Sequence, residues 1–383
     1  MSPKIVITGM GIISRLGENF SEVMAKLKND SEIRSSLSDN VCCEDFDPIK
    51  HLGKKKLRNL NRCTKMLLAA GKLALNDAGI IINQECEENT GVVLASNYGV
   101  DANVREMEEI LYKEGVVGIN PASAYIVSLN GVTSQMSIHM KAKAFNITTS
   151  SGTDAISFAK NLITTRRANV VMVGGAEDVS KKLMGDFYRQ GLLAASNAAS
   201  QPFRPESQGM ILGDGAAVII LEESEHALLR NANVYAEVGE CGLTYYPDPG
   251  VMSAGFIADA IKKIIVKSGL ELNDIGLIMS SANGSALDMA ELNAYTGLFD
   301  ADALVFNVKS FFGECFGFTN ILQVAFGAYL IRQNDTKPVV NLGSIKNNRF
   351  DFCEKRFGEP FSNALINNVG LDGTAGVLLL KRA

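Results

Sequence analysis

The chain has 383 residues, of which 46% are hydrophobic and 21% are charged, a composition that is ordinary for a globular protein. Its 37 basic and 42 acidic residues leave a formal charge of -5, which argues against a general nucleic-acid binder and gives no support for a role at a membrane surface. A small molecule or another protein is the better expected partner.

The N-terminal stretch "MSPKIVITGMGIIS" holds an apolar run that is too short to span a membrane, and it lacks a signal-peptide cleavage pattern. We therefore expect the protein in the cytoplasm. Its "GMGIIS" turn is only a weak match to a dinucleotide fingerprint, because Ser14 stands where the third glycine belongs. Seven cysteines without a CxxC pair and only three histidines predict reduced thiols, no metal site and no cofactor.

Short runs rich in β-branched residues alternate with helical stretches along the chain, a pattern that predicts an α/β fold with helix-covered sheets. The expected strands are 4–9, 90–96, 144–149, 169–175, 216–223, 275–281, 303–308, 337–343 and 375–381. The expected helices are 64–78, 154–166, 254–268 and 319–331.

A helical "SEHALLRNAN" stretch separates a first block of elements from a second block with similar ordering. No low-complexity linker marks the junction. This predicts two duplicated halves, an N-terminal half over residues 1–225 and a C-terminal half over 226–383.

The stretch "NITTSSGTDAISF", residues 146–158, predicts the end of a buried strand, a turn of small hydroxyl residues, and a helix. Such a turn suits an active site, because a helix N-terminus offers N–H groups and a positive dipole end to a developing oxyanion. Its alcohols need a base to take their proton. The histidines His51, His139 and His226 stand in stretches typical of surface or packing positions, so none is expected to supply that base.

Several motifs, in order along the whole chain, resemble the β-ketoacyl synthase family of the thiolase fold. They are "IVITGMGIIS", "NLNRCTKMLLAAGKLALNDAG", "NVVMVGGAEDVS", "QPFRPESQGMILGDGAAVIILEE", "VKSFFG" and "VGLDGTAGVLLLK". The resemblance implies a five-layered α/β/α/β/α sandwich that is normally dimeric. It also implies decarboxylating Claisen condensation, in which a cysteine carries the acyl chain and two histidines act on malonyl bound to the acyl carrier protein.

The sequence departs from this family at each of the three catalytic positions. Alignment with the family motifs places Thr149 at the cysteine, Asn283 at the first histidine and Glu314 at the second, while the family lysine is kept as Lys309. A threonine hydroxyl ionises far less readily than a thiol, an amide cannot shuttle a proton, and a carboxylate repels a malonyl carboxylate. Leu371 stands at the position of the phenylalanine gate of the family. Because all three catalytic residues are replaced, we expect no condensation.

Other interpretations stay open for these residues. Thr149 is either a residual nucleophile or a small residue filling a retired turn, and the latter is favoured. Lys309 could support catalysis with Asp288 and Glu291, or it could form a structural ion pair with Glu314, which we expect. The basic stretch 49–62 is either a solvated face or a surface that attracts an acidic acyl carrier protein.

The resemblance also implies that the segment 119–140 crosses a dimer interface and lines an acyl tunnel. Its large side chains Tyr125, Leu129 and Met136 are therefore candidate substrate-binding residues together with Leu371, although the first three could equally be core.

Taken together, the residues predict a ketosynthase-like subunit similar to a chain length factor, one that pairs with an active ketosynthase in type II polyketide, aryl polyene or fatty acid biosynthesis. The expected partners are that ketosynthase, or a second copy of the chain, and an acyl carrier protein, with no nucleic acid and no membrane. One alternative is an acyltransferase or thioesterase that uses Thr149 or Ser150. Another is a homodimeric scaffold or binding protein without catalysis.

Overall fold

A computed structural model describes the positions of most of the chain. The described residues are 3–29, 42–123, 125–194, 201–204, 206–207, 209–247, 252–333, 340–347 and 362–383. Within these ranges, none of the helices combines the length and the apolar character needed to cross a membrane.

Five strands of the first half form one sheet region in the order β3-β2-β4-β5-β1. Their bounds are β1 Ile5–Ile13, β2 Thr90–Ala95, β3 Asn146–Thr149, β4 Val170–Glu177 and β5 Gly215–Glu223. Strands β3, β2 and β4 run parallel to one another, whereas β5 is antiparallel to both β4 and β1.

The second half repeats this arrangement with its own five strands in the order β8-β7-β10-β11-β6. Their bounds are β6 Ala236–Tyr245, β7 Leu277–Met279, β8 Leu304–Phe306, β10 Asn363–Val369 and β11 Thr374–Lys381, with a short β9 Val340–Asn341 beside β8. The pairing directions match those of the first half strand for strand. Strands β1 and β6 pair with each other and join the two regions, so the duplication expected from the sequence is confirmed in the fold.

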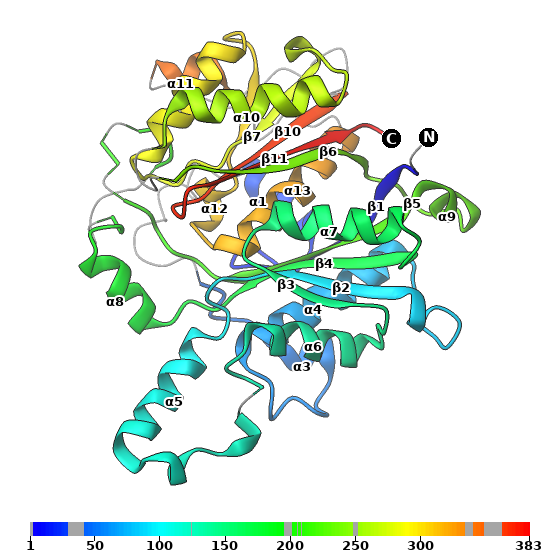
Figure 1. The fold of residues 1–383 in the computed structure, drawn as a ribbon, viewed down its shortest axis with the longest axis vertical. Helices are drawn as coiled ribbons and strands as arrows, with labels where there is room; N and C mark the ends of the chain where they lie inside the picture. The colour runs from blue at the N-terminus through cyan, green and yellow to red at the C-terminus, as the bar shows by residue number, and fades with distance from the viewer. Residues whose placement is uncertain are drawn as a thin grey trace.

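Helices occupy three layers around these two sheet regions (Figure 1). The central layer holds α7 Gly152–Thr164 and α13 Phe316–Gln333, each of which contacts strands of both halves. The outer layers hold α4 Arg62–Ala78 and α6 Leu129–Met140 on one side, and α10 Ala254–Lys267 and α11 Leu287–Leu298 on the other. Since α13 is apolar on almost every face, only this sandwiched position buries it fully. The thiolase-like five-layered sandwich is therefore confirmed.

Further helices complete the described fold. They are α1 Phe20–Asn29, α3 Pro48–Leu52, α5 Asp101–Glu114, α8 Lys181–Arg189, α9 Ser224–Leu229, α12 Lys309–Phe312 and α14 Leu342–Lys346. Single 3₁₀ turns are η1 Glu87–Asn89, η2 Val116–Gly118, η3 Pro121–Ser123 and η4 Leu272–Asp274. The division predicted between residues 225 and 226 falls within α9 and stays a prediction.

The four helices expected from the sequence are present, with ends that differ by no more than three residues. Two strands, β6 and β10, were not expected. The expectation of a buried strand before the hydroxyl turn is wrong: β3 is half exposed because it forms the edge of the sheet. His51, expected in a loop, lies on the short helix α3.

Close backbone approaches bring the two halves together at the strand ends. A Cβ at Gly175 on β4 would lie 2.2 Å from the carbonyl oxygen of Gly317, and a Cβ at Gly317 would lie 2.3 Å from that of Ala95 on β2. A Cβ at Gly152 would similarly meet Asn320 at 2.6 Å. These glycines let the first turns of α7 and α13 lie directly against each other and against the ends of β2 and β4, where the site forms.

Candidate active site

A cavity of about 380 Å³ opens where the two halves meet, at the first turns of α7 and α13. Both halves contribute to its wall. The lining residues are Asn97, Tyr98, Ser150, Ser151, Phe187, Gln190, Leu192, Asn283, Lys309, Glu314, Phe316, Asn320, Asn368, Val369, Gly370, Leu371, Asp372 and Thr374. Four predicted site residues are thereby brought to one cavity: Asn283, Glu314, Lys309 and Leu371.

The hydroxyl turn before α7 presents its serines, and not its threonine, to this cavity. Thr149 ends β3, and its Oγ1 donates to the backbone oxygen of Ser151 at 2.9 Å and to that of Leu94 at 3.3 Å. Thr149 is not among the residues that line the cavity, whereas Ser150 and Ser151 are. A hydroxyl that donates to backbone carbonyls has its proton engaged by groups that cannot remove it, so this geometry does not activate Thr149 as a nucleophile.

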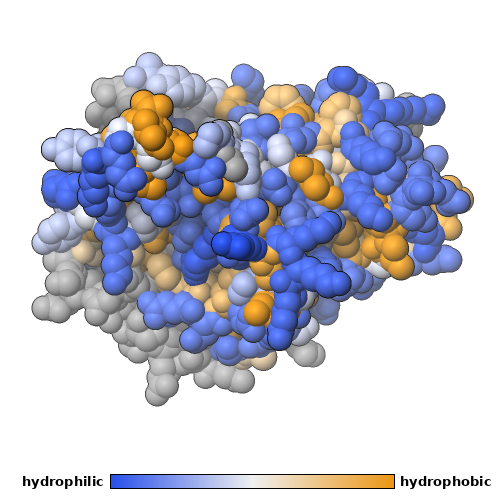
Figure 2. Space-filling model, turned by 90° about the horizontal axis from the view of Figure 1, so that it is seen from below, coloured by the Kyte–Doolittle hydropathy of each residue, from blue (hydrophilic) through white to orange (hydrophobic). Residues whose placement is uncertain are grey.

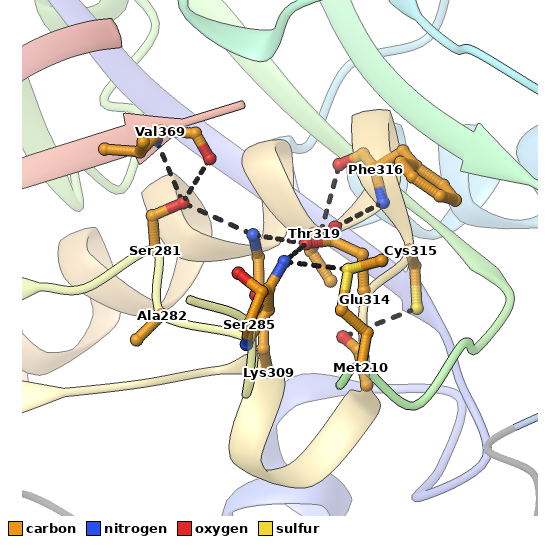
Figure 3. Close-up of polar contacts among 12 residues, drawn as sticks. Met210, Ser281, Ala282, Ser285, Lys309, Glu314, Cys315, Phe316, Thr319 and Val369 are labelled. Atoms are coloured by element: carbon orange, nitrogen blue, oxygen red, sulfur yellow. Dashed lines mark hydrogen bonds and ion pairs between the residues drawn. The ribbon is translucent and has the colours of Figure 1, made fainter. Parts of the chain in front are cut away.

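The residues predicted to stand at the two family histidine positions contact each other directly. The Nδ2 of Asn283 donates to Oε2 of Glu314 at 2.9 Å, and Nζ of Lys309 lies 2.7 Å from the same oxygen. All three side chains are buried. The ion pair expected between Lys309 and Glu314 is therefore confirmed (Figure 3).

The loop that ends in Asn283 is held by Ser281. The Oγ of Ser281 accepts from Nζ of Lys309 at 3.3 Å and from the backbone N–H of Val369 at 3.0 Å, and it donates to the carbonyl of Val369 at 3.1 Å. Figure 3 shows Ser281 between Lys309 and Val369. This serine fixes the lysine relative to the Val369–Leu371 wall of the cavity.

Burial and charge act in opposite directions on Glu314. Desolvation by itself would raise the pKa of this carboxyl, but the charge of Lys309, hydrogen bonds from Lys309 and Asn283, and the backbone N–H of Phe316 together hold the pKa below its ordinary value. The lowered pKa favours the ionised form of Glu314 at neutral pH. A carboxylate already engaged by these donors is poorly suited to act as the missing base for the serines.

Two further carboxyls expected near the lysine are placed as supports behind the cavity wall. Burial raises the pKa of Asp288 to about 7, although it accepts backbone N–H groups from Phe203, Asn283 and Gly284. Burial likewise raises the pKa of Glu291, which accepts from Ser281 N at 2.8 Å. Neither residue lines the cavity.

A third buried carboxyl, Glu177 at the end of β4, holds the other side of the site. It accepts backbone N–H groups from Asn97, Tyr98 and Gly317. Desolvation raises the pKa of Glu177 to about 8 in spite of these bonds, because no cation is near it among its described contacts. Its bonds orient the Asn97–Tyr98 stretch toward the cavity.

Aromatic side chains form one wall that the sequence did not predict. The rings of Tyr98, Phe187 and Phe316 contact one another with centroid separations of 4.8–5.7 Å. Phe316 has φ of 44°, a left-handed conformation that is strained for a bulky residue and that is often found at functional sites. Leu371, at the family gate position, packs beside this wall.

Three of the predicted tunnel residues lie away from the cavity in the isolated chain. Met136 is fully buried and packs against Gly71 on α4. Leu129 packs against the same core, and the hydroxyl of Tyr125 donates to the carbonyl of Asn59 at 2.9 Å. Their part in an acyl tunnel stays a prediction about an assembled pair of subunits.

The three histidines are also absent from the cavity wall. His226 contacts Glu222 at 2.7 Å, His139 contacts the carbonyl of Gln135, and His51 lies 3.1 Å from Glu18. Within the described residues, no group of three or more histidine, cysteine or acidic side chains converges as a metal site.

Comparison with known proteins agrees with this architecture. A family model described as Beta-ketoacyl synthase, N-terminal domain, matches residues 2–227. The 3-oxoacyl-[acyl-carrier-protein] synthase 2 of Coxiella burnetii is 28% identical over 410 residues, which cover 99% of this chain and 98% of that protein. Synthase 1 of Haemophilus influenzae is 24% identical with 99% of both chains covered.

Solved structures share the fold over the full length. A β-ketoacyl synthase from Burkholderia phymatum has a TM-score of 0.86 at 23% identity, and the ishigamide ketosynthase/chain length factor has 0.82 at 21%, each covering 100% of both chains. A type II PKS acyl-carrier protein in complex with its ketosynthase has 0.80 at 18%, again over 100% of both chains. The family model, the full-length relatives and the fold lead to one conclusion: this chain belongs to the β-ketoacyl synthase family.

Proposed function

We propose that the chain is a non-condensing, ketosynthase-like subunit, comparable to a chain length factor, that pairs with an active β-ketoacyl-acyl-carrier-protein synthase. The pathway would be type II polyketide, aryl polyene or fatty acid biosynthesis in the cytoplasm. One observation carries this proposal: Asn283 and Glu314, at the two proposed histidine positions, hydrogen-bond to each other at 2.9 Å, so that neither position offers an imidazole for proton transfer.

Two features support a pairing surface in the first half. Strand β3 forms an edge of the sheet, and an unpaired edge is a template for association with another chain. Apolar side chains are exposed in and after α5, with Tyr112 92%, Val116 77% and Val117 97% exposed. The face seen from below in Figure 1 is mainly hydrophilic, with hydrophobic groups gathered in separate patches (Figure 2).

An acyl carrier protein is the proposed second partner. The structures of related proteins include a ketosynthase in complex with an acyl carrier protein. In the basic stretch 49–62, Lys50 is ion-paired with Glu18 and Arg62 with Asp178 and Asp214. Four further cations of this stretch are exposed: Lys54, Lys55, Lys56 and Arg58. The four exposed cations offer an attractive surface for an acidic partner, and binding there should weaken as salt is raised.

The direct test is release of labelled carbon dioxide from malonyl carrier protein by the isolated chain. We expect no turnover above a Thr149→Ala control, because the cysteine and both histidines are replaced. Turnover that this substitution abolishes would contradict the proposal. Addition of a cognate ketosynthase should then give a heterodimer by light scattering and restore product formation.

The length-setting role is tested in that reconstituted pair by mass spectrometry of carrier-bound products. Replacement of Tyr125, Leu129 or Leu371 by Ala should lengthen the products, since removal of bulk admits further chain units, each stabilised by about 0.8 kcal/mol when buried. Met136 is a poorer probe: it is core in this chain, and its truncation should cost about 2–5 kcal/mol of stability. Identical product lengths in assembled pairs would reject the role.

One observation favours a second candidate, an acyltransferase or thioesterase. Ser150 is exposed and lines the cavity next to the first turn of α7. Acyl transfer to the purified protein that is lost in Ser150→Ala would establish this activity. A stable homodimer that ignores any ketosynthase and shows no acyl transfer would instead indicate a scaffold.

A further inference from the structure

The carboxylate of Glu314 lies in a cradle of hydrogen-bond donors that come from three separate segments. Its Oε2 receives Nζ of Lys309 at 2.7 Å and Nδ2 of Asn283 at 2.9 Å. Its Oε1 receives the backbone N–H of Phe316 at 2.9 Å and lies 3.3 Å from Oγ1 of Thr319, whose proton is shared with the carbonyl of Phe316 at 3.0 Å. A cation with neutral donors around it can bind a carboxylate ligand.

This cradle differs from that of the other buried carboxyl nearby. Asp288 also receives three donors, from the backbone of Phe203, Asn283 and Gly284, but it lies behind the wall and has no cation among its described partners. By contrast, Lys309, Asn283 and Glu314 all line the cavity. The donors around Glu314 are therefore close to the space that a ligand would enter, and the carboxylate of the chain itself engages them.

The cavity wall as a whole disfavours an incoming anion. Among its described lining residues the charged ones are Lys309, Glu314 and Asp372, so their formal charges sum to -1. The other polar lining groups are neutral amides and hydroxyls. Among them, Asn368 is 6% exposed and its Oδ1 is buried without a hydrogen-bond partner in the described structure, so it can accept from a ligand N–H or O–H.

We propose that Glu314 is a resident anion: it occupies a carboxylate-binding site within the cavity, so that the native pocket rejects carboxylate ligands and admits uncharged acyl ligands that bear an N–H or O–H donor. Removal of the Glu314 carboxylate then uncovers a site for small carboxylates on Lys309, Asn283, Phe316 N and Thr319. The choice of acyl ligands rests on the proposed function, whereas the uncovered anion site depends only on the geometry of the chain.

The first experiment measures the midpoint of thermal unfolding during titration with sodium formate at constant ionic strength. Glu314→Ala should gain a saturable rise in midpoint, because formate replaces the missing carboxylate. The native chain and Glu314→Gln, whose side chain still fills the cradle, should show no saturable rise. The double variant Lys309→Met/Glu314→Ala, which lacks the cation, should also show none.

A folded Glu314→Ala that does not respond to formate, or a native chain that responds equally, would overturn the proposal. Since this experiment needs no partner subunit and no acyl substrate, its failure is distinguishable from failure of the chain-length role. If addition of a ketosynthase restores product formation, the chain-length role is supported even when the formate site is absent.

The second experiment uses Glu314→Gln, which keeps the volume of the side chain. It therefore tests the resident anion even when Glu314→Ala does not fold. Binding of acetyl-pantetheine and malonyl-pantetheine to the native chain and to Glu314→Gln is measured by calorimetry. The native chain should favour the uncharged acetyl compound, and Glu314→Gln should reduce that preference roughly tenfold or more, the effect of one charge-assisted contact. Equal discrimination by both proteins would contradict a resident anion.

Discussion

Two buried glutamates accept backbone N–H groups from adjacent residues in the first turn of α13, yet their pKa values are shifted in opposite directions. Glu177 receives the N–H of Gly317, and Glu314 receives the N–H of Phe316. Burial raises the pKa of Glu177 to about 8 and acts in the same direction on Glu314, but the pKa of Glu314 is lowered because Lys309 at 2.7 Å, together with the donors Asn283 and Phe316 N, offsets the desolvation. Backbone donors alone do not keep a buried carboxyl charged here; the cation does.

Glu177 and Glu314 also have different roles in this site. Glu177 stands in the "GGAE" motif of the first half and holds the Asn97–Tyr98 stretch as a neutral group. Glu314, which the sequence predicts to stand where the family has a histidine, places an ion-paired carboxylate in the cavity wall. The two glutamates therefore hold the two sides of the site in different ways, one by backbone N–H groups and one by an ion pair as well.

The largest effect on stability is expected when the cation that distinguishes Glu314 from Glu177 is removed. Lys309→Met leaves Glu314 buried and unpaired, which should cost about 3–5 kcal/mol of stability at pH 8. The loss should shrink toward pH 5, because an unpaired Glu314 takes up a proton and becomes neutral as pH falls. Urea unfolding at both pH values measures it.

Two controls sharpen this result. Lys267 pairs with Glu240 at 2.7 Å but is 61% exposed, so Lys267→Met should cost less than about 1 kcal/mol. The double variant Lys309→Met/Glu314→Gln should recover part of the loss. A loss in Lys309→Met that is no larger than in Lys267→Met would show that the buried pair does not hold Glu314 ionised.

The pH dependence of stability that Glu177 contributes should be opposite in sign to that of native, ion-paired Glu314. The folded pKa of Glu177, about 8, lies above the unfolded value, so the folded state binds the extra proton and stability falls as pH rises between about 4.5 and 8. The slope from one such group is at most about 1.4 kcal/mol per pH unit. Glu177→Gln should lower absolute stability yet flatten this slope.

Asp288, whose pKa is about 7, contributes to the same fall, so the slope in Glu177→Gln should be reduced and not abolished. Stability measured by denaturant titration from pH 5 to 9 gives both slopes. An unchanged slope in the variant would mean that Glu177 is ionised throughout this range, as Glu314 is.

The smallest effect is expected from one neutral donor to Glu314. Thr319→Val removes the Oγ1 contact with Glu314 at 3.3 Å and the bond to the carbonyl of Phe316 at 3.0 Å, and it should cost about 1 kcal/mol, because Lys309, Asn283 and Phe316 N still engage the carboxylate. Thr296→Val, at a half-buried helical threonine with the same kind of bond to the carbonyl three residues before it, is the matched control. A loss comparable to that of Lys309→Met would show that the cradle depends on all of its donors equally.

The sequence allowed the fold, the family and the Lys309–Glu314 pair to be predicted, because each depends on local patterns or on spacing within one motif. It did not reveal β10, "NALINNV", since three asparagines mask a strand that tertiary contacts bury. It also missed the aromatic wall. Tyr98, Phe187 and Phe316 come from distant segments, and nothing in their local sequence indicates that they converge. Asn368 could have been predicted to line the cavity, because it directly precedes the motif that contains Leu371.

The place of β1 in the sheet has a consequence for the synthesis of the protein. Ile5–Ile13 pairs with Gly215–Glu223 and Ala236–Tyr245, so this strand leaves the ribosome long before its partner strands, which lie more than 200 residues further along the chain. At about 5–20 residues per second, this interval lasts on the order of 10–40 seconds. During that time "IVITGMGII" is an apolar segment without a neighbour, and we expect it to be the part of the nascent chain that most needs a chaperone.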